Sequence, residues 1–154
     1  MNITANKTAI NSIVLADDDQ DDLSIFQDVL SSLNKQIKLD IVSNGNELMS
    51  LLEHYCPDLL FLDLEMPYKN GLECLVEIKN NPALSNLPIV IFSSTTRPSN
   101  IQTAYDMGGH LFLIKSALYK EHYEAIKAIL NMDWSNPNAI KENYSVNGRY
   151  AAFS

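Results

Sequence analysis

The feature that most constrains the fold is an alternation of short apolar runs with longer segments of helical spacing, which extends over residues 12–130. Segments of strand length and largely apolar character occur at residues 13–16, 58–63, 87–92 and 111–114, and a further strand fits residues 37–42. Runs of this kind that alternate with helices are typical of a parallel sheet covered by helices on both faces. The sequence therefore predicts an α/β fold built from five βα units.

Between the predicted strands, apolar residues recur every three or four positions, as on the buried face of an amphipathic helix. The apolar positions with this spacing are Leu23, Phe26, Leu30 and Leu33; Leu48, Leu51, Leu52 and Tyr55; Leu72, Leu75, Val76 and Ile78; Ile101, Ala104, Tyr105 and Met107; and Tyr119, Tyr123, Ile126 and Leu130. Pro57 ends the second helix, and Gly108 suits a left-handed cap at the end of the fourth.

Length and charge limit the class of protein. The chain has 154 residues, 46% of them hydrophobic, which fits one domain with a sizeable core. Its formal net charge of -8 argues against direct nucleic-acid binding, which requires clustered Lys and Arg. The apolar runs are too short to span a bilayer, the N-terminal residues lack a secretory pattern, and Cys56 and Cys74 lack metal-ligand spacing. We expect a cytoplasmic protein that does not contact membranes.

The periodicity also gives the domain boundaries. Residues 1–11 form an N-terminal lead, residues 12–131 the folded domain, and residues 132–154 a C-terminal extension that forms no domain of its own. The extension loses the helical spacing and gains Asn, Ser and Pro, so we place it outside the core. Its aromatic residues are expected to pack on a surface or a partner: Trp134, Tyr144, Tyr150 and Phe153. An arm of this kind docks on its parent domain or exchanges between subunits, which would give a homodimer.

Polar residues follow four of the predicted strands, where ligands bind in parallel α/β sheets. Five carboxylates lie within the six residues 17–22 after the first strand, Asp63 ends the third, Ser93 follows the fourth and Lys115 follows the fifth. Carboxylates this dense repel one another unless a cation neutralises them. For Asp21 and Asp22 we favour a simpler role, in which first-turn acids complement the helix dipole.

These residue types suit a magnesium site that supports phosphoryl transfer. Oxygen ligands without imidazoles or thiols favour a hard cation, and Asp17, Asp18 and Asp63 supply carboxylates for Mg²⁺. A carboxylate can also act as a nucleophile toward phosphorus when nearby donors neutralise the phosphoryl oxygens. Lys115 and Ser93 are the candidate donors. His54, His110 and His122 show no ligand spacing, and we assign them no chemistry.

Four motifs occur in the order LADDDQDD, FLDLEMP, IFSS and FLIK. With these motifs, the chain from about Ser12 to Leu130 resembles the receiver domain of two-component response regulators. The resemblance implies a flavodoxin-like (βα)5 fold, in which a doubly wound five-stranded parallel sheet has the strand order 2-1-3-4-5. The LADDDQDD and LPIVIFSS segments are also similar, more weakly, to single-domain regulators that partner bacterial phytochromes.

The resemblance implies a role for each motif residue. Asp63 would be the phosphoacceptor, Asp18 a direct Mg²⁺ ligand and Asp17 a direct or water-mediated one. The backbone carbonyl of Glu65 would be the third protein ligand, and Ser93 and Lys115 would contact the phosphoryl group. Ser93 and Phe112, on the fourth and fifth strands, would form the switch that responds to phosphorylation.

The resemblance also implies partners. A sensor histidine kinase or a phosphotransfer protein would donate the phosphoryl group, and a downstream protein would read the result by contact. The chain would not be an enzyme beyond assisting its own phosphorylation and dephosphorylation.

Two alternatives stay open at this point. Asp63-Leu64-Glu65 approximates the acid pair of haloacid dehalogenase-like phosphatases, although that pair normally lies on the first strand. The second alternative is a receiver-like interaction module that works without phosphorylation. It is suggested by Ser116, which stands where the family usually has a proline in a cis peptide, so the Lys115–Ser116 bond is either cis or trans.

Overall fold

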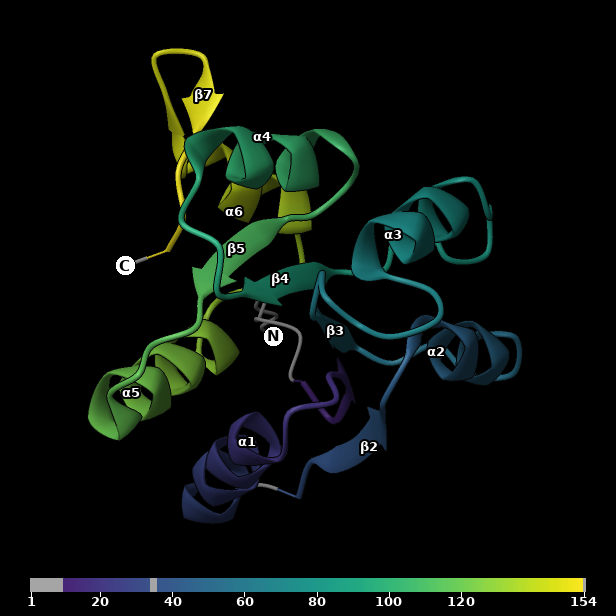
Figure 1. The fold of residues 1–154 in the computed structure, drawn as a ribbon, viewed down its shortest axis with the longest axis vertical. Coiled ribbons are helices and arrows are strands. Elements are labelled where there is room, and N and C mark those ends of the chain that lie inside the picture. The colour runs from purple at the N-terminus through teal and green to yellow at the C-terminus, as the bar shows by residue number, and fades with distance from the viewer. Residues whose placement is uncertain (1–9, 34–35, 154) are drawn as a thin grey trace, which may run out of the picture.

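A five-stranded parallel sheet forms the centre of the protein (Figure 1). The computed structural model describes residues 10–33 and 36–153; residues 1–9 of the predicted N-terminal lead lie outside the described residues. The strands are β1 (Ser12–Ala16), β2 (Lys38–Val42), β3 (Leu59–Leu62), β4 (Ile89–Ser93) and β5 (Leu111–Ile114), in the order β2-β1-β3-β4-β5. Both the predicted α/β class and the strand order 2-1-3-4-5 are confirmed.

Helices cover both faces of this sheet. They are α1 (Gln20–Ser32), α2 (Gly45–Leu52), α3 (Gly71–Lys79), α4 (Pro98–Asp106) and α5 (Tyr119–Leu130), followed by the short α6 (Pro137–Glu142). Helices α1 and α5 pack on one face, while α2, α3 and α4 pack on the other (Figure 1). No helix in the described ranges has the length and apolarity needed to cross a membrane.

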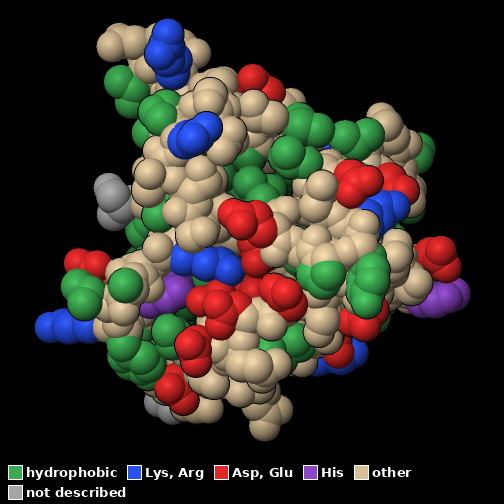
Figure 2. Space-filling model, viewed as in Figure 1, with side chains coloured by type: hydrophobic (Ala, Val, Ile, Leu, Met, Phe, Trp, Pro, Cys, Tyr) green, Lys and Arg blue, Asp and Glu red, His purple; other side chains and the backbone are tan. Residues whose placement is uncertain are grey.

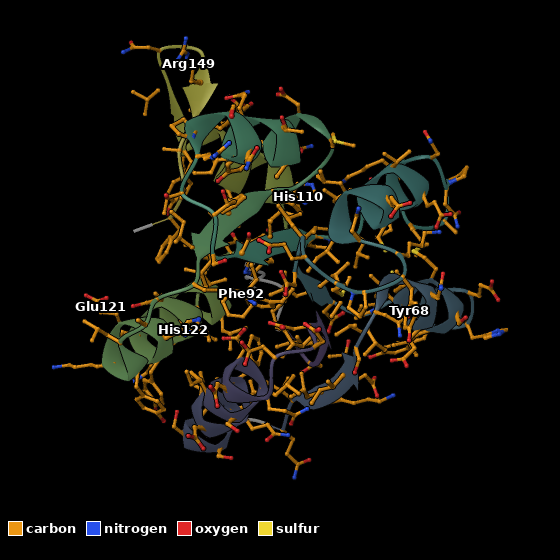
Figure 3. All side chains as sticks on the ribbon, viewed as in Figure 1. Tyr68, Phe92, His110, Glu121, His122 and Arg149 are labelled. Carbon is orange, nitrogen blue, oxygen red and sulfur yellow. The ribbon has the colours of Figure 1, made fainter. Side chains whose placement is uncertain are left out.

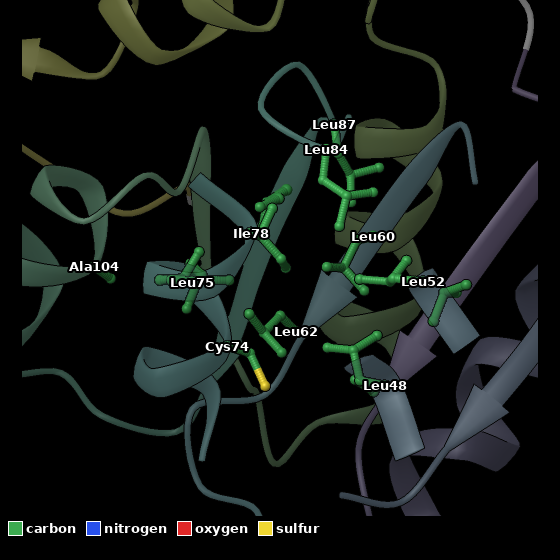
Figure 4. Close-up of a cluster of buried hydrophobic side chains, with 14 of the residues drawn as sticks. Leu48, Leu52, Leu60, Leu62, Cys74, Leu75, Ile78, Leu84, Leu87 and Ala104 are labelled. Carbon is green, nitrogen blue, oxygen red and sulfur yellow. The ribbon is translucent and has the colours of Figure 1, made fainter. Parts of the chain in front are cut away.

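Each face of the sheet buries its own apolar cluster. All residues of β3 and β4 are buried, as expected for central parallel strands covered on both sides. Leu60 and Leu62 of β3 point into the cluster beneath α2 and α3, where they meet leucines from both helices (Figure 4). The intervening Phe61 points to the opposite face and packs edge-on against Phe26 of α1. The alternating sides of one strand thus hold both layers of helices.

Local sequence signals place several helix ends, but the prediction that Pro57 ends the second helix is wrong, because α2 already ends at Leu52. Asp19, Asn44 and Asn70 each accept a backbone N–H with their side chains at the starts of α1, α2 and α3. After α4, Gly108 has a φ of 124°, so the predicted glycine cap is confirmed. The predicted fourth strand at 87–92 is shifted by one or two residues, because β4 runs from Ile89 to Ser93. Ser93 is therefore the last residue of the strand.

The placement of the C-terminal extension outside the core is wrong for two of its residues. Trp134 and Ile140 are 3% and 7% exposed and belong to the apolar cluster beneath α1 and α5. The indole Nε1 of Trp134 donates a hydrogen bond to the Ile129 carbonyl at 2.9 Å. Composition concealed this packing, because two apolar side chains dispersed among polar residues carry no periodic signal.

The rest of the extension forms a hairpin and returns to the sheet. Strands β6 (Ser145–Val146) and β7 (Arg149–Tyr150) flank an Asn147-Gly148 turn whose residues both have positive φ, a turn typical of tight hairpins. Beyond it, the Phe153 amide donates to the Phe112 carbonyl at 2.8 Å, and Phe153 forms a parallel bridge with Leu113. The extension therefore docks on its parent domain; exchange between subunits stays a prediction.

We call the contact between this extension and the outer side of β5 the β5 edge; it comprises Tyr105, Phe112, Leu113 and residues 151–153. The Tyr105 hydroxyl accepts a hydrogen bond from the Phe112 amide at 3.0 Å and donates one to the Ala151 carbonyl at 2.9 Å. The Tyr105 ring stacks on Tyr150, with centroids 4.8 Å apart. One side chain of α4 thus joins the strand to the extension.

Candidate functional site

The aspartates of residues 17–22, after β1, differ in burial and in hydrogen bonding. Asp17 is fully buried, whereas Asp18 is exposed. The Asp17 Oδ1 accepts the Asp19 amide at 2.9 Å, and the Asp19 side chain accepts the Asp21 amide at the start of α1. The cluster thus caps the helix with one carboxylate and presents Asp17 and Asp18 at the carboxyl end of the sheet.

Asp63 lies beside this pair, directly after β3. It is 4% exposed, its amide donates to the Ala16 carbonyl at 2.9 Å, and its Oδ1 accepts the Glu65 amide at 3.0 Å. Gly71 at the start of α3 packs against the Asp63 backbone so closely that a Cβ there would lie 2.4 Å from the Asp63 carbonyl oxygen. Backbone contacts from both sides therefore fix the position of this carboxylate.

Asp17, Asp18 and Asp63 converge as the sequence predicted. One carboxylate oxygen from each lies within 4.8 Å of the other two. The Oδ2 of Asp17 is buried and has no hydrogen-bond partner among residues 10–33 and 36–153, although the Lys115 ammonium lies 3.1 Å away. Acidic side chains gather at the centre of the face that Figure 2 shows. The residues present fit a hard divalent cation, which would satisfy the buried oxygen and reduce the repulsion.

Lys115 extends from the end of β5 into this group of carboxylates. Its ammonium donates to the Asp63 Oδ2 at 3.1 Å and forms ion pairs with Asp17 at 3.1 Å and Asp22 at 2.7 Å. The described residues contain no cis peptide bond, so the Lys115–Ser116 bond is trans. Lys115 therefore reaches Asp63 without the proline. We call Asp17, Asp18, Asp22, Asp63 and Lys115 the acidic pocket.

Burial and charge shift the pKa values in the acidic pocket in different directions. Burial raises the pKa of Asp17 to about 8, and it also raises the pKa of Asp63. Burial opposes the charged form of Lys115, but the surrounding carboxylates outweigh it, and the pKa of Lys115 lies above its usual value. An ionised lysine thus faces two carboxylates, Asp17 and Asp63, whose proton affinity is increased by burial.

Aromatic rings form the apolar wall of the acidic pocket. The Lys115 ammonium lies 5.1 Å from the centroid of the Phe92 ring, and the His122 ring of α5 lies beside Phe92, with centroids 5.1 Å apart (Figure 3). His122 is 1% exposed, neither ring nitrogen has a hydrogen-bond partner, and burial lowers its pKa. His122 therefore adds a neutral ring and no second cation.

The predicted switch residues lie on the neighbouring strands β4 and β5. Ser93 is buried, its hydroxyl accepts the Thr95 amide at 3.3 Å, and it borders a cavity of about 220 Å³ that Glu65 also lines. Phe112 is buried one strand away. Glu65 contacts Asp63 through its amide, so a role for its carbonyl as a metal ligand stays a prediction. The structure thus gathers Asp17, Asp18, Asp63 and Lys115, and it places Ser93 and Phe112 on the two adjacent strands β4 and β5.

Asp22 is the residue of the acidic pocket that sequence reasoning missed. We assigned it to the helix dipole, yet its side chain is 9% exposed and lies 2.7 Å from the Lys115 ammonium. A signal for this burial was present in the sequence. Asp22 stands four residues before Phe26 and seven before Val29, which is the spacing of one helix face, and both of these residues are buried.

The comparisons with known sequences agree with this geometry. A family model described as response regulator receiver domain matches residues 13–127. The response regulator Rcp1 of Synechocystis is 29% identical over 124 residues, which cover 76% of this chain and 84% of the relative. The chemotaxis protein CheV1 of Helicobacter pylori is 35% identical over 109 residues, which cover 68% of this chain and 33% of that longer protein.

Solved structures give the same result. The phosphorylated cyanobacterial phytochrome response regulator RcpA shares 30% sequence identity and a TM-score of 0.77, over 82% of this chain and 96% of that one. The Mn²⁺-bound form of Rcp1 shares 27% identity and a TM-score of 0.75, over the same fractions. Since the family model spans most of the sequence and the sheet order agrees, the chain belongs to the response regulator receiver domain family of two-component signalling.

Proposed function

We propose that this chain is a phosphoacceptor that takes a phosphoryl group onto Asp63 and signals by contact with another protein. The observation that carries the proposal is the acidic pocket, in which Asp63 lies within 4.8 Å of two further carboxylates and 3.1 Å from the Lys115 ammonium. A nucleophilic carboxylate beside a cation site and a positively charged donor is the arrangement that phosphoryl transfer requires.

Asp17, Asp18 and Asp63 would hold the metal, together with the backbone carbonyl of Glu65. Receiver domains bind Mg²⁺ or Mn²⁺ in an acidic pocket, and the related Rcp1 has been solved with Mn²⁺ bound. A divalent cation in this position supplies positive charge that stabilises the phosphoryl oxygens during transfer.

The chemical step uses a phosphohistidine on a histidine kinase or phosphotransfer protein, the kinds of partner with which receiver domains interact. An Asp63 carboxylate oxygen attacks phosphorus and forms an O–P bond, while the N–P bond of the donor breaks. The electron pair of the broken bond stays on the imidazole nitrogen, which then takes a proton from solvent. The backbone contacts of Asp63 hold the attacking oxygen in place, which lowers the entropic cost of the reaction.

Lys115 and Ser93 act on the phosphoryl group after it arrives. The Lys115 ammonium is already within hydrogen-bond distance of the Asp63 Oδ2, so a short movement brings it to a phosphoryl oxygen. Ser93 ends the neighbouring strand, and its hydroxyl borders the cavity beside Glu65, which gives it room to move. Charge on the phosphoryl group would draw both donors inward.

The signal leaves through the fourth helix, fifth strand and fifth helix. Phosphorylation favours one of two preexisting arrangements of this region, with Ser93 moving inward and the Phe112 ring following it. Support for this route is the position of Phe112, which is buried on β5 three residues before Lys115 and belongs to the apolar cluster that includes Ile101, Ala104 and Tyr105 of α4. The downstream partner would bind to this region.

Neither alternative function gains support. A haloacid dehalogenase-like phosphatase normally carries its nucleophile on the first strand, whereas Asp63 follows the third strand in sequence. The receiver-domain match gives no reason to prefer that enzyme class. A module that works without phosphorylation was suggested by Ser116, but Lys115 reaches Asp63 despite that serine.

The test is phosphorylation by a small donor. Purified protein incubated with Mg²⁺ and acetyl phosphate should gain a single phosphoryl group, which is stable in acid and labile in base and is visible by intact mass. Asp63→Asn should abolish this gain, since the nucleophilic oxygen is replaced by an amide. Asp58→Asn makes the same charge change at the opposite end of β3, where Asp58 accepts the Ser12 amide, and should leave phosphorylation intact.

Three outcomes would contradict the proposal. The first is the absence of modification in the presence of Mg²⁺. The second is modification that persists unchanged in Asp63→Asn. The third is steady turnover of phosphomonoesters, which would favour the phosphatase.

A further inference from the structure

Lys115 is surrounded by carboxylates from three separate elements. Asp17 follows β1, Asp63 follows β3, and Asp22 lies in the first turn of α1. The shortest of the three ammonium distances, 2.7 Å, is the one to Asp22. Asp17 and Asp63 belong to the predicted phosphorylation site, whereas Asp22 has no role in it so far.

The helix dipole does not explain why Asp22 is buried. Asp21 occupies the same first turn, is exposed and interacts with the dipole equally well from the surface. A buried carboxylate loses hydration, and that loss must be balanced by a charged or hydrogen-bonding partner. The Lys115 ammonium is the partner that the structure provides. The burial of Asp22 is therefore tied to the position of Lys115.

The lysine itself needs such an anchor. Its backbone is fixed by the hydrogen bond from its amide to the Ser93 carbonyl at 2.8 Å, but four rotatable bonds separate this backbone from the ammonium. The hydroxyl of Ser116, the next residue, donates a hydrogen bond to the Glu121 carboxylate of α5 at 2.8 Å. A carboxylate on a neighbouring helix restricts the far end of the side chain, which the strand cannot do.

We propose that Asp22 is a positioning residue that holds the Lys115 ammonium beside Asp63. This inference rests on the proposed function, since it assigns Asp22 to the phosphorylation of Asp63. Asp22 acts from outside the set of predicted metal ligands and through Lys115 alone. It keeps the ammonium close to the point where the phosphoryl oxygens arrive.

A pair of matched variants tests this role. Asp22→Asn removes the charge that contacts Lys115, while Asp21→Asn removes an equal charge from the same helical turn without touching it. We expect Asp22→Asn to slow phosphorylation by acetyl phosphate about five- to tenfold, the effect of losing one largely buried ion pair to the ammonium. Asp21→Asn should leave the rate within about twofold of the original chain. Denaturation midpoints check that both variants fold.

The same substitution in a chain that lacks the lysine side chain shows whether Asp22 acts through Lys115 or only through the stability of the fold. If Asp22 acts through Lys115, Asp22→Asn should not slow phosphorylation further in a chain that already carries Lys115→Ala. A further loss in that background, or a rate for Asp22→Asn equal to that of Asp21→Asn, would overturn the inference. Faster phosphorylation in Asp22→Asn would also overturn it, because Asp22 would then be withdrawing the lysine from the reaction.

An NMR measurement on the Lys115 ammonium, made without metal or phosphodonor, completes the test. In protein with ¹⁵N-labelled lysine, a restrained ammonium exchanges its protons slowly and gives a resolved side-chain signal, which Lys115→Ala assigns by its disappearance. This signal should persist in Asp21→Asn and weaken or vanish in Asp22→Asn. Its full retention in Asp22→Asn would refute positioning even if Asp63 is phosphorylated. Failure of Asp63 to accept a phosphoryl group would refute the proposed function, whatever the lysine signal shows.

Discussion

The acidic pocket and the β5 edge both include residues of β5 or the residue that follows it, Lys115. The polar groups of the β5 edge have partners within the protein, whereas the acidic pocket holds more negative than positive charge. At the β5 edge, the outward amide and carbonyl of Phe112 are bound by the Tyr105 hydroxyl and the Phe153 amide. In the acidic pocket, three carboxylates contact the Lys115 ammonium, and Asp18 lies near two of them. Full ionisation of these four carboxylates and one lysine leaves an excess of three negative charges (4 − 1 = 3).

This difference indicates that the β5 edge stabilises the fold and that the acidic pocket binds a ligand. Every polar group that is satisfied inside the protein adds to stability and leaves nothing for a ligand to supply. A pocket with excess buried charge lowers stability and gains free energy when a cation binds. We therefore expect changes at the β5 edge to alter folding, and changes in the acidic pocket to alter binding and pH dependence.

The largest effect is expected from removing the anchor of the C-terminal extension. Trp134→Ala empties a site in the core that the indole fills at 3% exposure, and it should lower the free energy of unfolding by about 3–5 kcal/mol. Urea denaturation measures this change. Val146→Ala in the exposed hairpin is the control and should shift the free energy by less than about 0.5 kcal/mol. A loss below about 1 kcal/mol for Trp134→Ala would mean that the extension does not pack on the core.

The next effect concerns pH in the acidic pocket. Burial raises the pKa of Asp17 from 3.8 to about 8, so between these values the metal-free folded chain holds a proton that the unfolded chain has lost. Stability then falls as pH rises through this window. In EDTA, the original chain should lose about 1–3 kcal/mol relative to Asp17→Asn between about pH 5 and pH 9. Parallel stability curves for the two chains would contradict the assignment.

Magnesium should make the original chain more stable than Asp17→Asn, the opposite of the result expected in EDTA. A bound cation requires ionised carboxylates, so binding displaces the proton from Asp17 and stabilises the original chain. Calorimetry near pH 7 in two buffers of different ionisation enthalpy should show proton release in the original chain and much less in Asp17→Asn. Equal proton release in both chains would place the displaced proton on another group.

A smaller loss is expected from the hydroxyl at the β5 edge. Tyr105→Phe keeps the ring against Tyr150 but leaves the Phe112 amide and the Ala151 carbonyl without their partner, which should cost about 1–3 kcal/mol. Thermal or urea denaturation measures the loss, and magnesium should stabilise this variant as much as the original chain. Tyr150→Phe, whose hydroxyl binds Glu142 at the surface, is the control and should show no measurable shift.

The smallest effect is expected from a surface contact close to the acidic pocket. The Tyr119 hydroxyl of α5 donates to the Asp28 carboxylate of α1 at 2.8 Å, but this hydrogen bond is exposed. Water replaces it readily, so Tyr119→Phe should not change the denaturation midpoint measurably. A clear destabilisation would show that the packing of α1 on α5 depends on this hydrogen bond. Changes that alter stability would then not be confined to the β5 edge and the core.

The sheet and the acidic residues could be predicted because their signals are local. The runs 13–16 and 59–62 are apolar throughout and are followed directly by carboxylates, and parallel strands bring such ends to one edge of the sheet. That rule alone placed Asp17, Asp18 and Asp63 together. The reach of Lys115 could not be predicted, since the missing proline left its direction open and the contacts of the folded domain decide it.

The sequence by itself determined the α/β class, the strand order implied by the motifs and the position of Asp63 at a strand end, because periodicity and residue order survive in a linear chain. Only the tertiary structure decided that Asp22 pairs with Lys115 and that Trp134 is buried. Both contacts join elements far apart in the sequence or residues without a periodic pattern. Their free energy comes from burial and charge pairing, which exist only after the elements have packed.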